Sequence, residues 1–332
     1  MGIGSHYKGC RLNRLLEGVA AVCDVLQGIS GGDVNIDPVM TLTRDPLYGL
    51  HPPGLWSPNR NCRLVETQDG WMAVNLPRNE DLASIPAWLG CGLDADPWQA
   101  LVEMAIMSST DALVKDAIDL HLPVAAVGEA VQLQNSALRH SASRNRSVID
   151  LSALWAGPLC GGLLAEAGFD VTKIEDPRRP DPSPNSTPQL NQRINGRKRH
   201  LAMSLQDLKL IEMIANARIL ITSARPHALA RAGLDEDRLF AINPDLLWIA
   251  ITAHGWRGNA AMRVGFGDDC AAAGGLLDWK GRQPCFMGDA LADPITGILA
   301  ATKAFEAITE GKAGLIDIAL SSASATFAGM IK

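Results

Sequence analysis

The feature that most constrains the fold is an alternation of short apolar runs with helical patterns after residue 147. Strands alternating with helices imply right-handed crossovers and a mostly parallel sheet covered on both faces. We therefore predict an α/β fold with a doubly wound, Rossmann-like sheet, whose ligands sit beyond the carboxyl ends of the strands. The predicted strands are Val148–Leu151, Asp170–Ile174, Ile219–Thr222 and Leu246–Thr252, and the predicted helical segments are Leu159–Gly168, Leu205–Asn216 and Ala228–Ala232.

The first part of the chain has a different pattern. A helix is predicted over Arg11–Ile29, and a connection rich in proline and glycine follows from Asp37 to Asn61. Asp69-Gly70 lies between two strand-like runs within Cys62–Leu76, which favours a hairpin. Three predicted helices and an apolar run then complete a smaller α+β unit: Asp81–Leu89, Trp98–Met107, Thr110–Leu120 and Pro123–Val127.

The length of 332 residues suits two domains. We predict an N-terminal helix region over 1–36, a small α+β domain over 37–133, a polar linker over 134–146 and a Rossmann-like domain over 147–332.

Composition excludes several classes of protein. A net charge of −6 makes nucleic acid an unexpected partner, and no stretch approaches the roughly 20 apolar residues of a membrane span. The seven cysteines include no CxxC motif and no histidine at metal-site spacing, which predicts reduced thiols in a cytoplasmic protein without a metal site.

One region is basic within this acidic chain. Residues 172–231 hold 11 lysines or arginines and five acids, a net of +6, so the remainder sums to −12. This pattern is compatible with a small phosphorylated ligand or with a solvated face of paired charges.

The run VIDLSALWAGPLCGGLLAEAGFDVTKIE (148–175) carries the first part of a resemblance to a known family. It resembles the opening of the class III coenzyme A transferases, the CaiB/BaiF family that includes formyl-CoA transferase. Later blocks keep the family order: Asn195 with Lys198-Arg199, ARILITSARPHALARAGL (217–234), INPDLLWIAITAHGWRG (242–258), Ala271–Leu277 and ALADPITGILAATKAFEAITEGKAGLIDIAL (290–320). The segments CRLVETQDGWMAVNL and DALVKDAIDLHLPVAAVGEA resemble the small domain of the family, which here precedes the large, CoA-binding domain.

The resemblance implies an enzyme that moves CoA from an acyl-CoA to a carboxylic acid. Asp293 matches the catalytic aspartate of the family, whose carboxylate attacks the thioester and then carries CoA as an aspartyl thioester. An N-terminal helix position would stabilise its charge. The sequence Ala292-Asp293-Pro294 also fits a simple helix cap followed by proline at the first helical position, and the two roles are compatible.

The resemblance also places the CoA contacts. Leu154, Trp155 and Ala156 follow the first strand, where the family binds the thioester end, with Trp155 in place of a glutamine. A core aromatic is the alternative for Trp155. Arg225, Arg231 and Ser223 fall in the loop after the third strand, with Ser223 replacing an asparagine. Asp176 stands where formyl-CoA transferase has an arginine, and Arg178 or Arg179 could supply that positive charge. Lys198-Arg199 is either part of this basic site or a solvated turn.

Phe266 occupies the position of the catalytic histidine of related racemases. Phenylalanine cannot exchange a proton, which argues against racemisation. The following family position is acidic, but here it is Gly267, followed by Asp268 and Asp269. If the acidic position is shifted by one residue, an acid still lies near Asp293; if it is not, the acidic neighbour that supports the pKa of Asp293 is missing. The alternative for Asp268-Asp269 is a polar turn.

The expected partners are an acyl-CoA and a carboxylic acid, with no permanently bound cofactor. Alternatives are an acyl-CoA lyase, dehydratase or hydrolase using the same intermediate, or an inactive CoA-binding partner subunit. The family also implies an interlocked homodimer. The apolar stripe of Arg11–Ile29 suits such a contact or packing within the chain.

Overall fold

A seven-stranded sheet forms the centre of the larger part of the protein. The computed structural model describes residues 10–44 and 48–331. The strand order is β4-β12-β9-β8-β5-β6-β7, and every pair is parallel except β4 with β12. The predicted α/β class with a mostly parallel sheet is confirmed. The strands of this sheet are β4 (Arg139–His140), β5 (Ser147–Asp150), β6 (Asp170–Glu175), β7 (Arg199–Ala202), β8 (Ile219–Thr222), β9 (Leu247–Thr252) and β12 (Lys312–Ala319).

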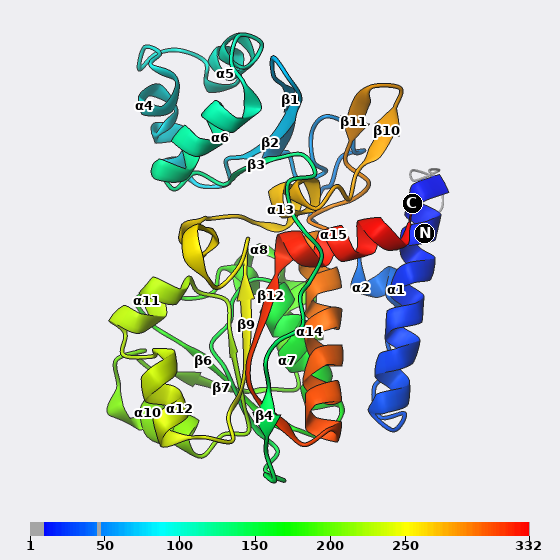
Figure 1. Ribbon diagram of the computed structural model, residues 1–332, viewed down its shortest axis with the longest axis vertical. Helices are drawn as coiled ribbons and strands as arrows, with labels where there is room; N and C mark the ends of the chain where they lie inside the picture. Colours follow the sequence, from blue (N-terminus) through cyan, green and yellow to red (C-terminus); the bar gives the residue numbers. More distant parts are fainter. Residues whose placement is uncertain (1–9, 45–47, 332) are drawn as a thin grey trace.

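Helices cover both faces of this sheet (Figure 1). Successive residues of a strand point to opposite faces. Accordingly, Leu247 and Ile249 pack in the core beneath α1, α7, α14 and α15, whereas Trp248 packs beneath α10, α11 and α12. The described helices of this part of the protein, among them the 3₁₀ helix η2, are α1 (Cys10–Ile29), α2 (Pro38–Thr41), α7 (Ala156–Glu166), α8 (Ser183–Ser186), α9 (Pro188–Asn195), α10 (Leu208–Ala215), α11 (Pro226–Arg231), α12 (Glu236–Ile242), η2 (Gly258–Met262), α13 (Gly267–Ala273), α14 (Ala292–Thr309) and α15 (Leu320–Met330).

A second, three-stranded antiparallel sheet has its own core (Figure 1). Its first two strands form the predicted hairpin, with Cys62 opposite Asn75 and Glu66 opposite Trp71. Beside it a two-stranded hairpin follows α13. These elements are β1 (Cys62–Glu66), β2 (Trp71–Asn75), β3 (Val124–Ala126), α3 (Asn79–Ala83), α4 (Ile85–Leu89), α5 (Pro97–Ala105), α6 (Thr110–Asp119), β10 (Asp278–Lys280) and β11 (Gln283–Cys285).

Helix α13 joins the small sheet to the parallel sheet. Cys62, Leu64 and Ala73 of the small sheet share a core cluster with Ala272 of α13 and Phe286, which follows β11. The backbone N–H groups of Gly128 and Ala130 donate to carbonyls of α13 at 3.0 and 2.9 Å. This contact places the small sheet beside the loops that lead into α13 and α14.

Some sequence-based expectations differ from the structure. The predicted helix over Asp81–Leu89 is two short helices, because Ser84 ends α3 and Pro86 lies in the first turn of α4. Helix α7 begins at Ala156, three residues earlier than predicted. The linker contributes β4, and the sequence analysis did not identify β7, β10, β11 or β12 as strands.

Two further alternatives are decided by packing. Helix α1 lies against α14 and α15 of the same chain, and Leu15, Val19 and Leu26 are fully buried there. The solvated-turn interpretation of Lys198 is wrong, because its ammonium group is buried and donates to Asp150 Oδ2 at 2.7 Å. None of the described helices combines the length and apolar character that a membrane span requires. Six cysteines are described with their side chains, and all are free thiols.

Candidate active site

Asp293 lies in the first turn of α14, as its second residue. The helix is capped by Leu291, so the interpretation of Asp293 as the N-cap residue is wrong. Its backbone N–H donates to the carbonyl of Ala290 at 2.9 Å. Its side chain is half-buried, and no hydrogen bond joins its carboxylate to another residue in the described ranges. The carboxylate therefore keeps its oxygens available to a ligand.

Gly267 forms one wall around this carboxylate. A Cβ atom at Gly267 would lie 2.3 Å from Asp293 Oδ2 and 2.7 Å from the Cβ and carbonyl oxygen of Ala290. No side chain fits in that space. The structure therefore explains why this position is a glycine: an acidic side chain here would overlap Asp293.

The acidic neighbour is Asp268 instead. It is buried, its Oδ1 accepts from the Ala290 N–H at 2.7 Å, and its Oδ2 accepts from Asn59 Nδ2 at 2.7 Å. It lies close enough to Asp293 to raise the pKa of that carboxyl. The acid near Asp293 therefore lies one residue after the family's acidic position, which Gly267 occupies. The polar-turn alternative fails, because Asp268 and Asp269 are buried at the start of α13.

The carboxylates around Asp293 face one cation. Burial raises the pKa of Asp293 to about 7, and the charges of Asp268 and Asp289 add to this increase, whereas Arg44 lowers it. Arg44 pairs with Asp289 through its Nε and Nη2 atoms. At neutral pH a substantial fraction of Asp293 is therefore ionised and poorly solvated, which suits a nucleophilic carboxylate.

The loop after β5 borders the same region. Leu154 adopts a left-handed backbone conformation, with φ 68°. Its N–H donates to Asp181 Oδ2 at 3.0 Å, and its carbonyl accepts from Ser183 Oγ. Trp155 is 2% exposed, so the core alternative describes its ring, and the Arg44 guanidinium lies 5.3 Å from the ring centroid. Ala156 begins α7, and its carbonyl leaves no room for a Cβ at Gly297 of α14.

Phe266 precedes Gly267 and stands before α13. Its N–H donates to Asp269 Oδ1 at 2.9 Å, and the Arg78 guanidinium lies 5.7 Å from its ring centroid. The same Asp269 oxygen accepts from Asn75 Nδ2 of β2 at 2.8 Å. Phe266 is thus held between the small sheet and the carboxylate site.

The predicted basic residues divide into two groups. Arg178 forms two hydrogen bonds to Asp176 and one to Ser204, so its charge is already compensated. Lys173, Lys198 and Arg218 of the basic region are buried and bind protein groups. By contrast, Arg179 and Arg231 lie near Arg225, whose pKa is lowered by burial and by these like charges. Ser223 accepts from the Ala153 N–H at 2.9 Å and so fixes the loop after β5.

Sequence reasoning missed the residues that the first part of the chain brings to this site. Arg44, Asn59 and Arg78 lie more than 180 residues before the groups they face. Arg44 and Asn59 stand in the connection from Asp37 to Asn61, which was predicted to be irregular. Arg78 lies between the predicted hairpin segment Cys62–Leu76 and the predicted helix Asp81–Leu89.

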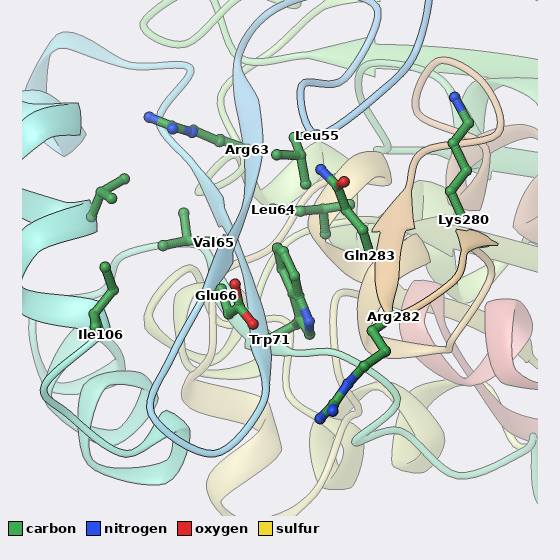
Figure 2. A pocket seen from close by; sticks show the side chains of 11 residues that line it. Leu55, Arg63, Leu64, Val65, Glu66, Trp71, Ile106, Lys280, Arg282 and Gln283 are labelled. Atoms are coloured by element: carbon green, nitrogen blue, oxygen red, sulfur yellow. The ribbon is translucent and has the colours of Figure 1, made fainter.

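A pocket among the described residues lies elsewhere. It has a volume of about 460 Å³ and opens between β1, β2, the end of α5 and the β10–β11 hairpin (Figure 2). Trp71 and Arg282 border it, and none of the predicted site residues does. A smaller pocket of about 310 Å³ lies against Trp155 and Leu159.

One group among the described residues has the composition of a metal site. The potential ligand atoms of His254, Asp269 and Cys270 lie within 4.8 Å of one another. Asp269 Oδ1 is already engaged by Asn75 and Phe266, and this contact fixes α13 to β2. Asp269 therefore has a structural role of its own.

The fold and these residues define a doubly wound α/β protein with a half-buried carboxylate at the start of α14. Residues 144–331 match CoA-transferase family III, and the chain belongs to this family.

Individual relatives carry transferase names. The chain is 28% identical over 200 residues to succinyl-CoA–D-citramalate CoA-transferase of Chloroflexus aurantiacus, covering 52% of this chain and 48% of that protein. It is 30% identical over 197 residues to succinate–glutarate CoA-transferase of Agrobacterium fabrum, covering 52% and 49%. A crystal structure of a CaiB/BaiF family protein from Brucella suis aligns with a TM-score of 0.48 at 26% identity, over 56% of this chain and 55% of that one. The chain spans about half the length of the relatives it matches.

Proposed function

We propose that this protein transfers CoA from an acyl-CoA to a carboxylic acid, with Asp293 as the covalent nucleophile. The observation that carries the proposal is the half-buried Asp293 carboxylate at the start of α14, with its pKa raised to about 7 and no hydrogen-bond partner among the described residues. Membership of CoA-transferase family III supports the reaction type. The names of the relatives support a carboxylic acid as acceptor.

In the proposed reaction an Asp293 oxygen attacks the thioester carbonyl, and the carbon–sulfur bond breaks to release CoA thiolate. The thiolate then attacks the aspartyl carbonyl of the resulting anhydride. This step forms aspartyl-CoA and frees the first acid as a carboxylate. The incoming carboxylate then attacks the carbonyl of aspartyl-CoA, the carbon–sulfur bond breaks, and a second anhydride and CoA thiolate result. The thiolate attacks the carbonyl of the incoming acid in that anhydride, and the bond from this carbonyl to the Asp293 oxygen breaks to give the new acyl-CoA. Asp293 is regenerated, and no proton needs to be supplied in either half.

Two features of the site support this sequence of steps. Arg44 and the first turn of α14 offset the charge of the carboxylate, so ionisation does not require full hydration. Gly267 allows the carboxylate to lie against backbone, which restricts its orientation.

The test is to trap the covalent intermediate. After incubation with an acyl-CoA, hydroxylamine should convert Asp293 to a hydroxamate, which peptide mass spectrometry locates. Asp293→Asn should lose this product and about 10³-fold or more of the transfer rate, because it removes the nucleophile. Asp170→Asn, at an exposed carboxylate paired with Arg199, is the matched control.

Transfer of isotopically labelled acid into acyl-CoA separates this function from its alternatives. Hydroxamate formation with release of free acid but no labelled acyl-CoA would indicate a hydrolase. Binding of CoA without any modification at Asp293 would contradict covalent catalysis and favour a binding subunit.

A further inference from the structure

A cluster of four arginines and one histidine lies where the small sheet meets the loop after β8. We call it the arginine clamp, and its members are Arg78, His121, Arg179, Arg225 and Arg231. Arg78 and His121 come from the small-sheet part of the chain, and the three other arginines come from the parallel-sheet part. Arg225 Nη1 lies 3.5 Å from His121 Nδ1, and Arg78 Nη2 lies 3.5 Å from the His121 carbonyl oxygen. His121 therefore touches arginines of both parts.

The clamp lacks compensating negative charge on its parallel-sheet side. No ion pair to a described residue engages Arg179, Arg225 or Arg231, and Arg225 donates to the carbonyl of Met262 at 3.2 Å. Arg78 is paired with Asp81, yet its guanidinium still reaches His121 and Phe266. Like charges held this close repel one another, and an anion bound between them would relieve that repulsion.

The backbone of His121 adds a second observation. It follows α6 with φ 56°, the left-handed conformation in which glycine carries no steric penalty. The chain instead places an exposed imidazole there, directed at Arg225.

The clamp is also adjacent to the carboxylate site. The Arg78 guanidinium lies over the ring of Phe266, and the next residue, Gly267, contacts Asp293. An anion in the clamp would thus bind close to the backbone that confines the Asp293 carboxylate.

We propose that Arg78 and His121 bind a phosphate group of coenzyme A together with Arg225 and Arg231, so that the small sheet completes the nucleotide site. This inference rests on the proposed function, since it assigns that substrate's phosphates to residues of the first part of the chain. Guanidinium groups match phosphate oxygens in geometry and charge. The phosphate belongs either to the diphosphate or to the 3′-phosphate of the nucleotide.

The experiment is a titration of adenosine 3′,5′-bisphosphate into the full chain by calorimetry. His121→Gly should weaken binding about threefold to tenfold, and Arg78→Gln about tenfold or more, with a shallower salt dependence. His121→Gly leaves the fold intact because glycine accepts φ 56°. Arg199→Gln, an exposed arginine paired with Asp170, is the matched control.

A comparison of CoA with dephospho-CoA identifies the phosphate. An Arg78→Gln penalty seen only with CoA assigns the clamp to the 3′-phosphate, and an equal penalty with both assigns it to the diphosphate. The inference is overturned if both variants bind every ligand as the wild type does, or if the wild type binds none. If Arg78→Gln and His121→Gly weaken nucleotide binding but the wild type transfers no CoA, the proposed function is refuted and the phosphate-site inference stands.

Discussion

Asp293 combines two properties that usually oppose each other, since it is a nucleophile and it is poorly solvated. Burial and the neighbouring charges of Asp268 and Asp289 raise its pKa to about 7, and Arg44 acts in the opposite direction. Cys270 also lies close, but burial and nearby carboxylates raise the pKa of its thiol well above the usual value, so it stays neutral. The ionisation of Asp293 is therefore set by a few neighbours and can be measured.

The transfer rate should depend on pH with a midpoint near 7. Below this pH the carboxyl is protonated and the rate should fall about tenfold per unit; above it the rate should level off. Arg44→Gln should move the midpoint to higher pH, because it removes the charge that lowers the pKa of Asp293. Steady-state kinetics from pH 5 to 9 would check both expectations. A flat profile between pH 5 and 8 would contradict the assignment of Asp293 as the titrating nucleophile.

At the scale of elements, the start of α13 and the start of α14 form the site together. Asp268 in α13 accepts the N–H of Ala290, which stands just before α14 with φ 46°. Gly267 lets the two helix starts approach until its backbone touches the Asp293 carboxylate. The close approach of these two elements, more than either helix alone, fixes the orientation of the nucleophile.

Gly267→Ala should therefore disable transfer without abolishing nucleotide binding. The added methyl group would lie 2.3 Å from Asp293 Oδ2, so the carboxylate must move, and misplacement by about 1 Å costs on the order of 10²-fold in rate. Kinetics and calorimetry with adenosine 3′,5′-bisphosphate would separate the two effects. Gly28→Ala, in α1 with open space around the new atom, should change neither. Wild-type transfer by Gly267→Ala would show that Asp293 is not confined as described.

At the scale of the whole molecule, polar contacts add to the apolar cluster that joins the small sheet to α13. Asn59 donates to Asp268 and Asp289, Asn75 donates to Asp269, and Arg263 pairs with Glu129. Burial raises the pKa of Asp269 to about 7. The folded protein therefore holds a proton between about pH 4 and 7 that the unfolded chain releases, and this group makes the fold less stable as pH rises through that window.

Asp269→Asn should consequently unfold at higher urea concentration than the wild type at pH 8. The amide oxygen can still accept from Asn75 and Phe266, and no charge is buried. The gain in the free energy of unfolding should grow from pH 4 to 7 and level off above at about 4 kcal/mol, because each unit by which the pKa is raised corresponds to roughly 1.4 kcal/mol. Asp170→Asn, at an exposed carboxylate, should show no such trend. A gain that is constant between pH 5 and 8 would contradict a buried, titrating Asp269.

The sequence by itself determined the parallel α/β class, the hairpin and the family. These properties are written in local patterns: runs of β-branched residues such as Ile219–Thr222, the Asp69-Gly70 turn, and ordered blocks such as that around Asp293. Local patterns gave wrong predictions where the environment of a side chain depends on the folded structure. The local sequence suggests that Lys198 is solvated, but it is paired with buried Asp150. It also suggests that Asp293 is the N-cap of α14, but Leu291 occupies that position.

Only the tertiary structure decided which groups face the nucleophile and the basic cluster. Arg44, Asn59, Arg78 and His121 carry no motif, and they reach the site because the small sheet packs on α13. The physical reason is that electrostatic and hydrogen-bond partners are selected by distance in space, whereas sequence periodicity records only which face of an element is apolar.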